Sequence, residues 1–317
     1  MTDNDKERSE PALIIHGGAG RAFKDPQRQP AVREALAQIV EAVYVELEAG
    51  SPAVEAAVLG CRLLEDCPHF NAGTGSVLQS DGQIRMSASL MDGARHSFSG
   101  IINVSRVQNP IAMVEHLQGE KDRIVSDAGA QELARELGIE VYDPIVERRL
   151  TEWLDERRRD FSREAADVVS GAPDHHGSGT IGVVVLDRQG RLAAGTSTGG
   201  RGFERIGRVS DTAMPAGNYA SKVAAVSCTG IGEDIVDESL AVRLVVRAED
   251  GMSLEEAFKR SFDEALGRGR RFGAIGLDAS GFIVWGKTTE LLLGAYRRGQ
   301  KRGDLLAEET APKVTGF

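Results

Sequence analysis

The sequence predicts an α+β protein in which helices and antiparallel sheets stack as a four-layer α/β/β/α sandwich. Short apolar runs are separated by turn sequences such as Asp92-Gly93 and 187–190, which is the pattern of β-hairpins with antiparallel pairing. Stretches with apolar residues at helical spacing occur in both halves of the chain, and such amphipathic helices must cover sheet faces. Neither half has enough predicted strands to close a core alone, so we expect residues 1–317 to form a single domain.

In the first half of the chain, helices and strands are predicted to alternate. Apolar residues recur at helical spacing at 31–49, 52–66, about 110–118 and about 127–136, and these segments predict helices. The apolar run at 12–16 predicts a buried strand that ends in a turn at the glycine-rich residues 17–20. Residues 76–107 change to short apolar runs divided by Asp-Gly turns, which predicts a β-meander.

The second half is predicted to begin with a hairpin and to end with another. Expected strands are 181–186, 192–198, 223–228, 272–277 and 281–286, with helices near 232–248 and 253–267. Between the two halves, residues 140–179 are dense in charge of both signs and then rich in Gly, Pro and His. This segment predicts an exposed, partly helical connector with a solvated face that ends in a flexible loop, and Trp153 is expected to anchor its helix.

The composition is that of an ordinary globular protein of 317 residues with a formal net charge of −10. This charge argues against nucleic acid as a partner, because binding phosphate backbones requires a basic surface. The charged N-terminus does not resemble a signal peptide, and no stretch approaches the roughly 18 apolar residues of a membrane-spanning helix. The 3 cysteines cannot build a disulfide framework, which fits a reducing compartment. We therefore expect a cytoplasmic protein without membrane contacts.

The segment 176–182 is the basis of the main functional hypothesis, which is that the chain cleaves itself before Thr180. A loop containing Gly and His runs directly into an apolar strand, and the first residue of that strand, Thr180, follows Gly179. From this segment alone, a strand that simply begins with a β-branched residue is the more ordinary interpretation. The alternative is a self-cleavage junction, at which the Thr180 hydroxyl attacks the Gly179 carbonyl and an N-to-O acyl shift is followed by hydrolysis. Gly179 suits such a junction because glycine tolerates a strained backbone.

Cleavage at this junction would create a catalytic base. A free α-amino group has a pKa of about 7.7–8.0, so part of it is neutral at pH 7 and can accept the proton of its own hydroxyl. The amide nitrogen of the uncut chain cannot accept this proton. The cut would therefore switch the enzyme on.

Two polar clusters farther along the chain could complete a site that hydrolyses amides of amino acids. In the first cluster, Arg208 could bind a substrate α-carboxylate and Asp211 its α-ammonium group. In the second, Thr229 and Gly230 could donate to an oxyanion, and Gly232 permits a close approach of the backbone. Each cluster alone is weak evidence, because an Arg–Asp pair three residues apart is usually a surface ion pair and hydroxyl-glycine turns can also bind phosphate.

Taken in order along the chain, these motifs resemble the plant-type asparaginase/isoaspartyl peptidase family, which belongs to the N-terminal nucleophile hydrolases. The resemblance runs from about residue 12 to about residue 295 with similar spacing. The motifs are His16–Gly20, Cys67–Gly75, Met91–Gly93, Gly179–Gly182, Thr196–Gly200, Gly207–Asp211 and Ser227–Glu233. One departure is Arg85-Met86-Ser87, where the family usually has an acidic pair around a hydrophobic residue, and it bears on substrate preference and cleavage rate.

The resemblance implies a structural or chemical role for each motif. The precursor would be cut before Thr180 into an α chain, 1–179, and a β chain, 180–317, which assemble as an (αβ)2 dimer. The implied roles are Thr180 as nucleophile, Thr198 as its hydrogen-bond partner, Thr229 and Gly230 as the oxyanion hole, and Arg208, Asp211, Gly232 and Asn71 as substrate contacts. No catalytic cofactor is implied, but a structural sodium ion would be held by backbone carbonyls of Leu64, Glu65, Cys67, Phe70, Ala72 and Thr74.

The expected activity is therefore hydrolysis of β-aspartyl dipeptides first and L-asparagine second, with release of L-aspartate. The alternatives are a glycosylasparaginase, a binding protein of the same fold that never cleaves, and a phosphate-binding module. The lack of a signal peptide and of disulfides weighs against a lysosomal or secreted glycosylasparaginase. A Ser–His–Asp triad or zinc site in the segment 174–178 is disfavoured because adjacent residues do not converge easily on one point. His16 is expected to orient the glycine turn through hydrogen bonds rather than to act as a base.

Overall fold

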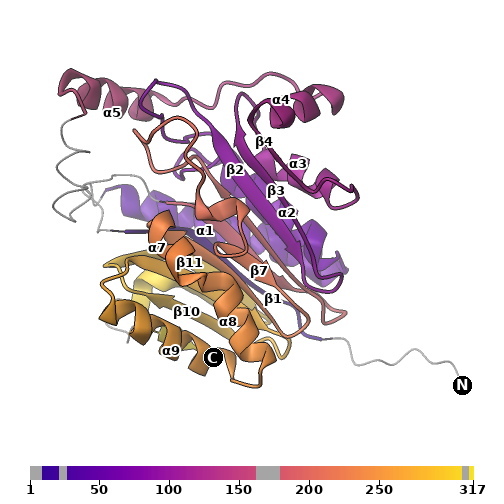
Figure 1. The fold of residues 1–317 in the computed structure, drawn as a ribbon. Helices are drawn as coiled ribbons and strands as arrows, with labels where there is room; N and C mark the ends of the chain where they lie inside the picture. The colour runs from indigo at the N-terminus through magenta and orange to yellow at the C-terminus, as the bar shows by residue number, and fades with distance from the viewer. Residues whose placement is uncertain (1–8, 21–26, 162–178, 309–313) are drawn as a thin grey trace, which may run out of the picture.

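The computed structural model describes residues 9–20, 27–161, 179–308 and 314–317, which form two β-sheets with helices packed against each of them (Figure 1). This confirms the predicted α+β class. In spatial order, the larger sheet contains β12 (Lys301–Asp304), β11 (Leu291–Arg298), β1 (Ala12–Gly20), β5 (Ile181–Leu186), β6 (Leu192–Thr198), β2 (Met86–Asp92), β3 (Ser97–Val104) and β4 (Ile124–Ser126). The smaller sheet contains β13 (Val314–Gly316), β10 (Ile283–Lys287), β9 (Phe272–Asp278), β8 (Ala224–Gly230) and β7 (Asn218–Ala220).

The strand that follows Thr180 lies in the interior of the larger sheet. β5 pairs with β1 on one side and with β6 on the other, so that Gly182 lies opposite both His16 and Thr196. Every residue of β5 is buried, because helices cover one face of this strand and the smaller sheet covers the other. Burial on both faces explains why the sequence of β5 is a continuous apolar run rather than an alternating one.

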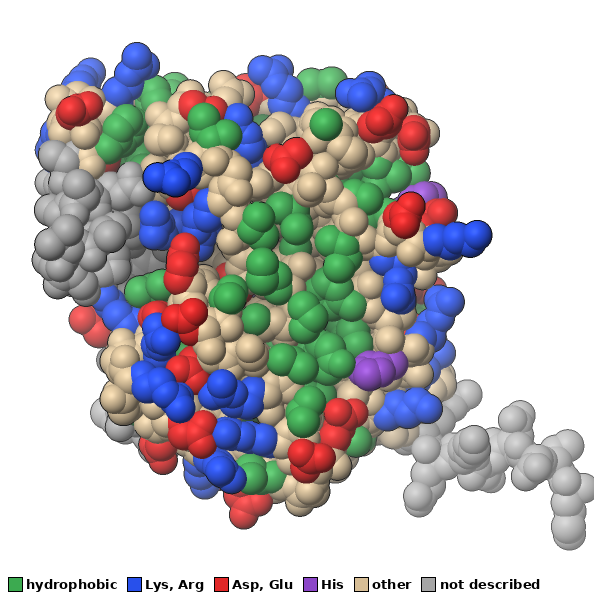
Figure 2. Space-filling model, in the orientation of Figure 1, with side chains coloured by type: hydrophobic (Ala, Val, Ile, Leu, Met, Phe, Trp, Pro, Cys, Tyr) green, Lys and Arg blue, Asp and Glu red, His purple; other side chains and the backbone are tan. Residues whose placement is uncertain are grey.

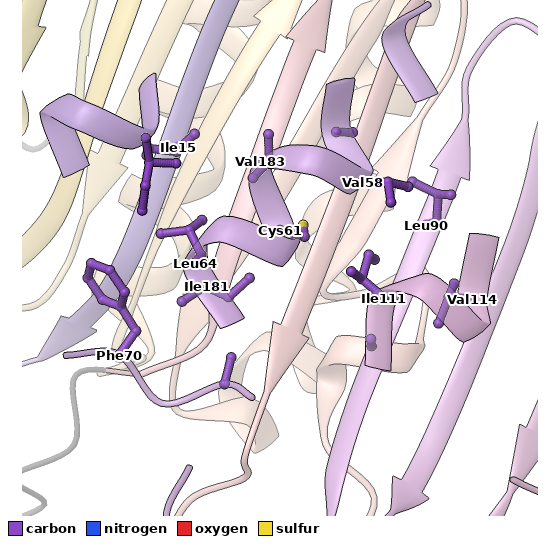
Figure 3. Close-up of a cluster of buried hydrophobic side chains, with 14 of the residues drawn as sticks. Ile15, Val58, Cys61, Leu64, Phe70, Leu90, Ile111, Val114, Ile181 and Val183 are labelled. Carbon is purple, nitrogen blue, oxygen red and sulfur yellow. The ribbon is translucent and has the colours of Figure 1, made fainter. Parts of the chain in front are cut away.

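Three helices cover the outer face of the larger sheet: α1 (Arg28–Ala49), α2 (Ala53–Asp66) and α3 (Pro110–Leu117). In Figure 3, Cys61 and Leu64 of α2 lie beside Ile181 and Val183 of β5 in one apolar cluster. A Cβ on Gly60 would lie 3.0 Å from both methyl carbons of Val183, so the absence of a side chain there lets α2 approach closely. The helix α4 (Asp127–Glu136) packs beside β3 and β4.

The smaller sheet is covered on its outer face by α8 (Leu240–Glu249) and α9 (Leu254–Gly267). A separate apolar cluster lies between the two sheets and includes Ile14, Val184 and Ile275. In this cluster β1, β5 and β6 face β8 and β9. The packing therefore brings the end of β8, from one sheet, close to the start of β5, from the other.

The predicted glycine turn at 17–20 is wrong. β1 continues to Gly20 and pairs with β11 over this stretch, with a register shift between His16 and Gly18. Gly18 has a φ of 126°, a conformation that favours glycine, so the glycine run makes a β-bulge instead of a turn. The predicted β-meander over 76–107 is correct only in its second part, because the strands begin at Met86 and form the β2–β3 hairpin.

Several short elements were not predicted. β4, β7 and β13 have 3 residues each, which is too few to show a periodic pattern, and β11 and β12 were missed as well. The single helix predicted at 232–248 is divided into α7 (Gly232–Glu238) and α8 by Ser239, whose φ is 47°. The structure also contains 3-10 turns, η1 (Asp211–Ala213) and η2 (Leu305–Glu308). None of the helices within the described ranges has an apolar stretch long enough to cross a membrane.

The predicted charged connector contains α5 (Glu147–Arg158), which is anchored to the rest of the protein. As predicted, Trp153 fixes this helix, because its Nε1 donates to the carbonyl of Gln79 at 2.9 Å. The prediction of a solvated face is wrong for Arg149, which is buried and donates from Nε to the carbonyl of Gly75 at 2.9 Å. The remainder of the connector, including Asp174, His175, His176 and Ser178, lies outside the described residues.

Candidate active site

Thr180 is buried immediately before β5, and its hydroxyl contacts a second threonine. Thr180 Oγ1 donates to Oγ1 of Thr198, the last residue of β6, at 3.2 Å. Thr198 Oγ1 also accepts from the backbone N–H of Gly200 at 3.1 Å. The strand register explains the contact: Ile181 lies opposite Ser197, so the next positions bring Thr180 and Thr198 together. The structure thus places in hydrogen-bond contact two residues that the sequence analysis assigned to one site.

Thr229 and Gly230 end β8 beside the Gly179–Thr180 peptide. A Cβ placed on Gly179 would lie 3.0 Å from Thr229 Oγ1, although the two residues belong to different sheets and segments. Thr229 is buried, and within the described residues its hydroxyl has no hydrogen-bond partner. A buried polar group without a partner destabilises the fold unless a ligand or water completes it. Thr229 therefore presents a buried hydroxyl, without a partner among the described residues, beside Gly179.

Gly230 has a backbone conformation that a side chain would not tolerate. Its φ is 136°, and a Cβ there would lie 2.6 Å from Cα of Phe272 on the neighbouring strand β9. Only glycine fits this position without displacing the β9 backbone. The fold therefore requires glycine at position 230, which is where a backbone donor for an oxyanion was predicted.

Arg208, Asp211 and Gly232 meet at the start of α7. A Cβ on Gly232 would lie 2.8 Å from both Arg208 Nη2 and Asp211 Oδ1, so the missing side chain lets both groups pack against the backbone at the start of α7. Arg208 is paired with Glu233 rather than with Asp211: its Nε donates to Oε1 at 2.7 Å and its Nη2 to Oε2 at 3.0 Å. The sequence analysis predicted the convergence of the first three residues but missed Glu233 as the partner.

The charges of this cluster are strongly perturbed. Burial raises the pKa of Asp211 to about 7, although the positive charge of Arg208 acts in the opposite direction. Burial would also raise the pKa of Glu233, but the hydrogen bonds and charge of Arg208 outweigh it and hold this pKa at about 2. Asp211 Oδ2 is buried without a partner in the described part of the chain. A buried carboxyl with a raised pKa and one oxygen without a partner among the described residues is a candidate binding group for a cation.

Asn71 connects two loops of the site. Its Nδ2 donates to the carbonyl of Gly200 at 2.7 Å, and its Oδ1 accepts from the N–H of Val77 at 2.9 Å. The carbonyl of Asn71 accepts from the N–H of Gly199 at 2.9 Å. The amide of Asn71 is thus occupied in holding the turn after Thr198, in addition to any contact with a substrate.

The loop 64–74, with the predicted sodium-binding carbonyls, folds back on itself. Glu65 O accepts from the N–H of Thr74 at 2.7 Å, and Phe70 and Ala72 are buried. A carbonyl oxygen has a second lone pair after such a bond, so these oxygens fit a hard cation in chemical type. In contrast, the described residues include no group of three or more His, Cys, Asp or Glu side chains suited to a metal ion.

Further polar residues next to the site were not assigned from the sequence. One hydrogen-bonded group consists of Thr196, Ser227 and His16. A second residue of this kind is Glu204, which is buried and whose charge contributes, after Glu233, to the raised pKa of Arg208. The hydrogen bond from His16 was expected at the glycine turn, but its Nε2 contacts Ser227 of the other sheet. No short spacing in the sequence relates these residues, because they lie on strands and loops far apart along the chain.

Comparisons with known proteins are consistent with this arrangement. Residues 9–307 match the family described as Asparaginase. An "Isoaspartyl peptidase/L-asparaginase" of Nostoc sp. is 57% identical over 305 residues, which cover 95% of this chain and 96% of the relative. A protein of the same name in Synechocystis sp. is 56% identical over 93% of this chain and 90% of its own length. A "Plant-type L-asparaginase" of Thermococcus kodakarensis is 35% identical over 90% of this chain and 96% of its own length.

Proposed function

The chain belongs to the asparaginase family, and we propose that it is an amidohydrolase with an N-terminal threonine nucleophile that cleaves β-aspartyl dipeptides and L-asparagine to release L-aspartate. The names of relatives at 57% and 56% identity specify these two substrates. The observation that best supports the chemistry is the position of Thr180: it immediately precedes a buried strand, contacts the hydroxyl of Thr198, and follows a glycine that lies against Thr229.

The first reaction is self-cleavage. Thr180 Oγ attacks the carbonyl carbon of Gly179, the C–N bond breaks, and the acyl group moves from nitrogen to oxygen as an ester. Water then hydrolyses the ester, which leaves a carboxylate on Gly179 and a free α-amine on Thr180. The Thr229 hydroxyl supports this step, because it lies next to Gly179 and has no other partner among the described residues.

The second reaction is substrate hydrolysis. The α-amine of Thr180 accepts the proton of its own hydroxyl, and the oxygen attacks the β-carbonyl carbon of the substrate. Thr229 and Gly230 stabilise the oxyanion, the amine leaves with the proton, and water releases L-aspartate from the acyl-enzyme. Arg208 binds the α-carboxylate and Asp211 the α-ammonium group, since the two side chains lie together against Gly232.

The fold is consistent with cleavage into two chains that remain together. We assign it to the four-layer α/β/β/α sandwich of the N-terminal nucleophile hydrolases, with 1–179 and 180–317 as its α and β chains. β1 and β2 come from the first chain and pair with β5, β6 and β11 from the second. Cutting one peptide bond before β5 leaves all of these pairings in place. Asn71 and the loop 64–74, with a bound sodium ion, hold the turn beside Thr198 in position.

The proposed assembly is an (αβ)2 dimer in the cytoplasm. Figure 2 shows hydrophobic side chains gathered in a band on the face that α8 and β3 share in Figure 1. Contiguous apolar surface of this kind favours association. Sedimentation of the cleaved protein tests the dimer, and a single αβ unit at micromolar concentration would contradict it.

Purified protein tests the proposed function directly. On a denaturing gel, the mature enzyme is expected to run as two fragments, and N-terminal sequencing of the second should begin at Thr180. Rates on β-aspartyl-leucine, L-asparagine and a glycosylated asparagine should rank in that order. Dominant activity on the glycosylated compound would instead indicate a glycosylasparaginase, and an intact, inactive chain would indicate a binding protein.

A further inference from the structure

A chain of buried polar side chains crosses from one sheet to the other beside Thr180. His16 lies in β1, is fully buried, and its Nε2 is 2.8 Å from Oγ of Ser227 in β8. Ser227 Oγ is in turn 2.7 Å from Oγ1 of Thr196 in β6. These groups lie in an interface that is otherwise lined by residues such as Ile14, Val184 and Ile275. The hydrogen bonds thus provide directional contacts in an apolar layer.

The polar chain occupies the space above Gly182. This glycine lies opposite His16 on one neighbouring strand and opposite Thr196 on the other. A Cβ on Gly182 would collide with Ser227 Oγ and His16 Nε2. The missing side chain, two residues after Thr180, is therefore what allows His16, Ser227 and Thr196 to meet.

The imidazole of His16 is neutral at physiological pH. Burial lowers its pKa to about 3, and the backbone of Thr180 has a smaller, opposite effect. His16 Nε2 and Ser227 Oγ share one hydrogen bond, and Ser227 Oγ and Thr196 Oγ1 share the next, with the imidazole tautomer setting which atom donates. A group with so low a pKa is a poor proton acceptor at pH 7, so this chain of hydrogen bonds fits a holding role and not base catalysis.

We propose that His16 is a positioning residue, which acts with Ser227 and Thr196 as a neutral hydrogen-bonded chain that fixes the first residues of β5 between the two sheets and thereby holds Thr180 in its attacking position. This inference rests on the proposed function of Thr180 as nucleophile. Apolar packing alone resists sliding weakly, whereas a displacement of about 1 Å at a reacting group can lower a rate roughly 100-fold.

The test uses substitutions that remove single hydroxyls with little change of shape. Ser227→Ala interrupts the chain in its middle, and Thr196→Val removes its end. The matched control is Ser99→Ala in β3, where an equally buried hydroxyl donates to the carbonyl of Val114 at 2.8 Å, away from Thr180. The kcat for L-asparagine is calculated per cleaved chain, and mass spectrometry measures how many chains begin at Thr180. This normalisation prevents slow self-cleavage from being mistaken for slow turnover.

Ser227→Ala is expected to lower kcat roughly 10- to 100-fold with KM within about twofold of the unsubstituted enzyme, because the substrate α-groups are bound elsewhere. Thr196→Val should lower kcat less, and Ser99→Ala should lower Tm without changing kcat. His16→Gln, which keeps an acceptor and a donor, should retain more activity than His16→Leu. A folded Ser227→Ala chain that stays uncut also supports the proposal, because the same hydroxyl attacks in both reactions.

Equal kcat values in Ser227→Ala and Ser99→Ala at a similar Tm would overturn the positioning role, as would equal activity of His16→Gln and His16→Leu. A third result would also overturn the positioning role. If kcat of His16→Gln no longer fell at acid pH as it does in the unsubstituted enzyme, His16 would be acting as the catalytic base. The unsubstituted chain separates the two claims: if it is cut before Thr180 and hydrolyses L-asparagine, the proposed function stands whatever the variants do.

Discussion

The two ends of the candidate site use different chemistry. Around Thr180, the proposed nucleophile, the nearby groups are hydroxyls and a neutral imidazole, all of them buried: Thr198, Thr229 and, behind them, His16. Around Gly232, the groups are charged: Arg208, Asp211 and Glu233. The comparison indicates that charge is concentrated where the proposed substrate would carry its own charges. The end around Thr180 contains no strong side-chain base among these groups, which is consistent with the proposal that cleavage creates the base.

The largest effect is expected at the nucleophile. Thr180→Ala should abolish both self-cleavage and amide hydrolysis, because it removes the attacking oxygen while the buried site stays intact. Thr180→Ser is the matched control and should retain measurable cleavage, since it keeps a hydroxyl at the same position. Mass spectrometry and an L-aspartate release assay check both variants. Amidase activity in uncut Thr180→Ala would contradict the proposal that the Thr180 hydroxyl carries out the reaction and that the charged end only binds the substrate.

The next largest effect is expected at the charged end. Arg208→Ala should still be cut before Thr180 but should bind substrate more weakly, with KM raised roughly 10- to 100-fold, because one charge-assisted hydrogen-bonding group is lost. A gel for cleavage and steady-state kinetics on L-asparagine measure the two properties separately. An unchanged KM would remove the carboxylate-binding role of Arg208.

Asp211 is expected to make KM depend on pH, with a change of about tenfold per pH unit below pH 7. Its pKa of about 7 means that the carboxyl becomes protonated below pH 7 and then cannot pair with a substrate ammonium group. KM for L-asparagine should therefore rise approximately tenfold per pH unit well below pH 7 and level off above it. Asp211→Asn, which cannot ionise, should show a high KM without this pH step. A KM that is flat from pH 5.5 to 8 in the unsubstituted enzyme would exclude Asp211 as the cation-binding group.

The smallest effect is expected from Glu233. Its negative charge contributes to the raised pKa of Asp211, so Glu233→Gln should move the pH step in KM to lower pH, by less than about one unit. The control is Glu255→Gln, which removes a surface charge paired with Lys259 on α9. The same shift in both variants would show that general surface charge, and not the Arg208–Glu233 pair, tunes the charged end.

The two ends also differ in how far the sequence could predict them. Thr180 and Thr229 could be proposed from their own sequence segments, and the role of Thr198 was implied by the family resemblance. The register of β5 and β6 explains the contact of Thr180 with Thr198, whereas Thr229 comes from the other sheet. Glu233 as the partner of Arg208, and the His16–Ser227–Thr196 chain, could not be predicted, because these contacts join residues 25, 211 and 31 positions apart. Such pairings depend on sheet stacking, which local periodicity does not encode.

The fold shows the same limit. Burial imposes a period on many helices and strands, and α1, α2, β5 and β6 were predicted well for this reason, although β11, with 8 residues, was missed. The glycine run after His16 was misread as a turn, because glycine serves both turns and bulges, and only the pairing with β11 distinguishes the two. Three-residue strands such as β7 are defined by their neighbours rather than by their own residues.

The central claim is that Thr180 reacts only after it has become a chain terminus. The most direct measurement follows freshly purified protein over time by intact mass spectrometry, with L-aspartate release from L-asparagine assayed on the same samples. We expect activity to grow in proportion to the fragment that begins at Thr180 and to be zero at the outset if no fragment is present. Full activity in samples that contain only the uncut 317-residue chain would contradict the claim.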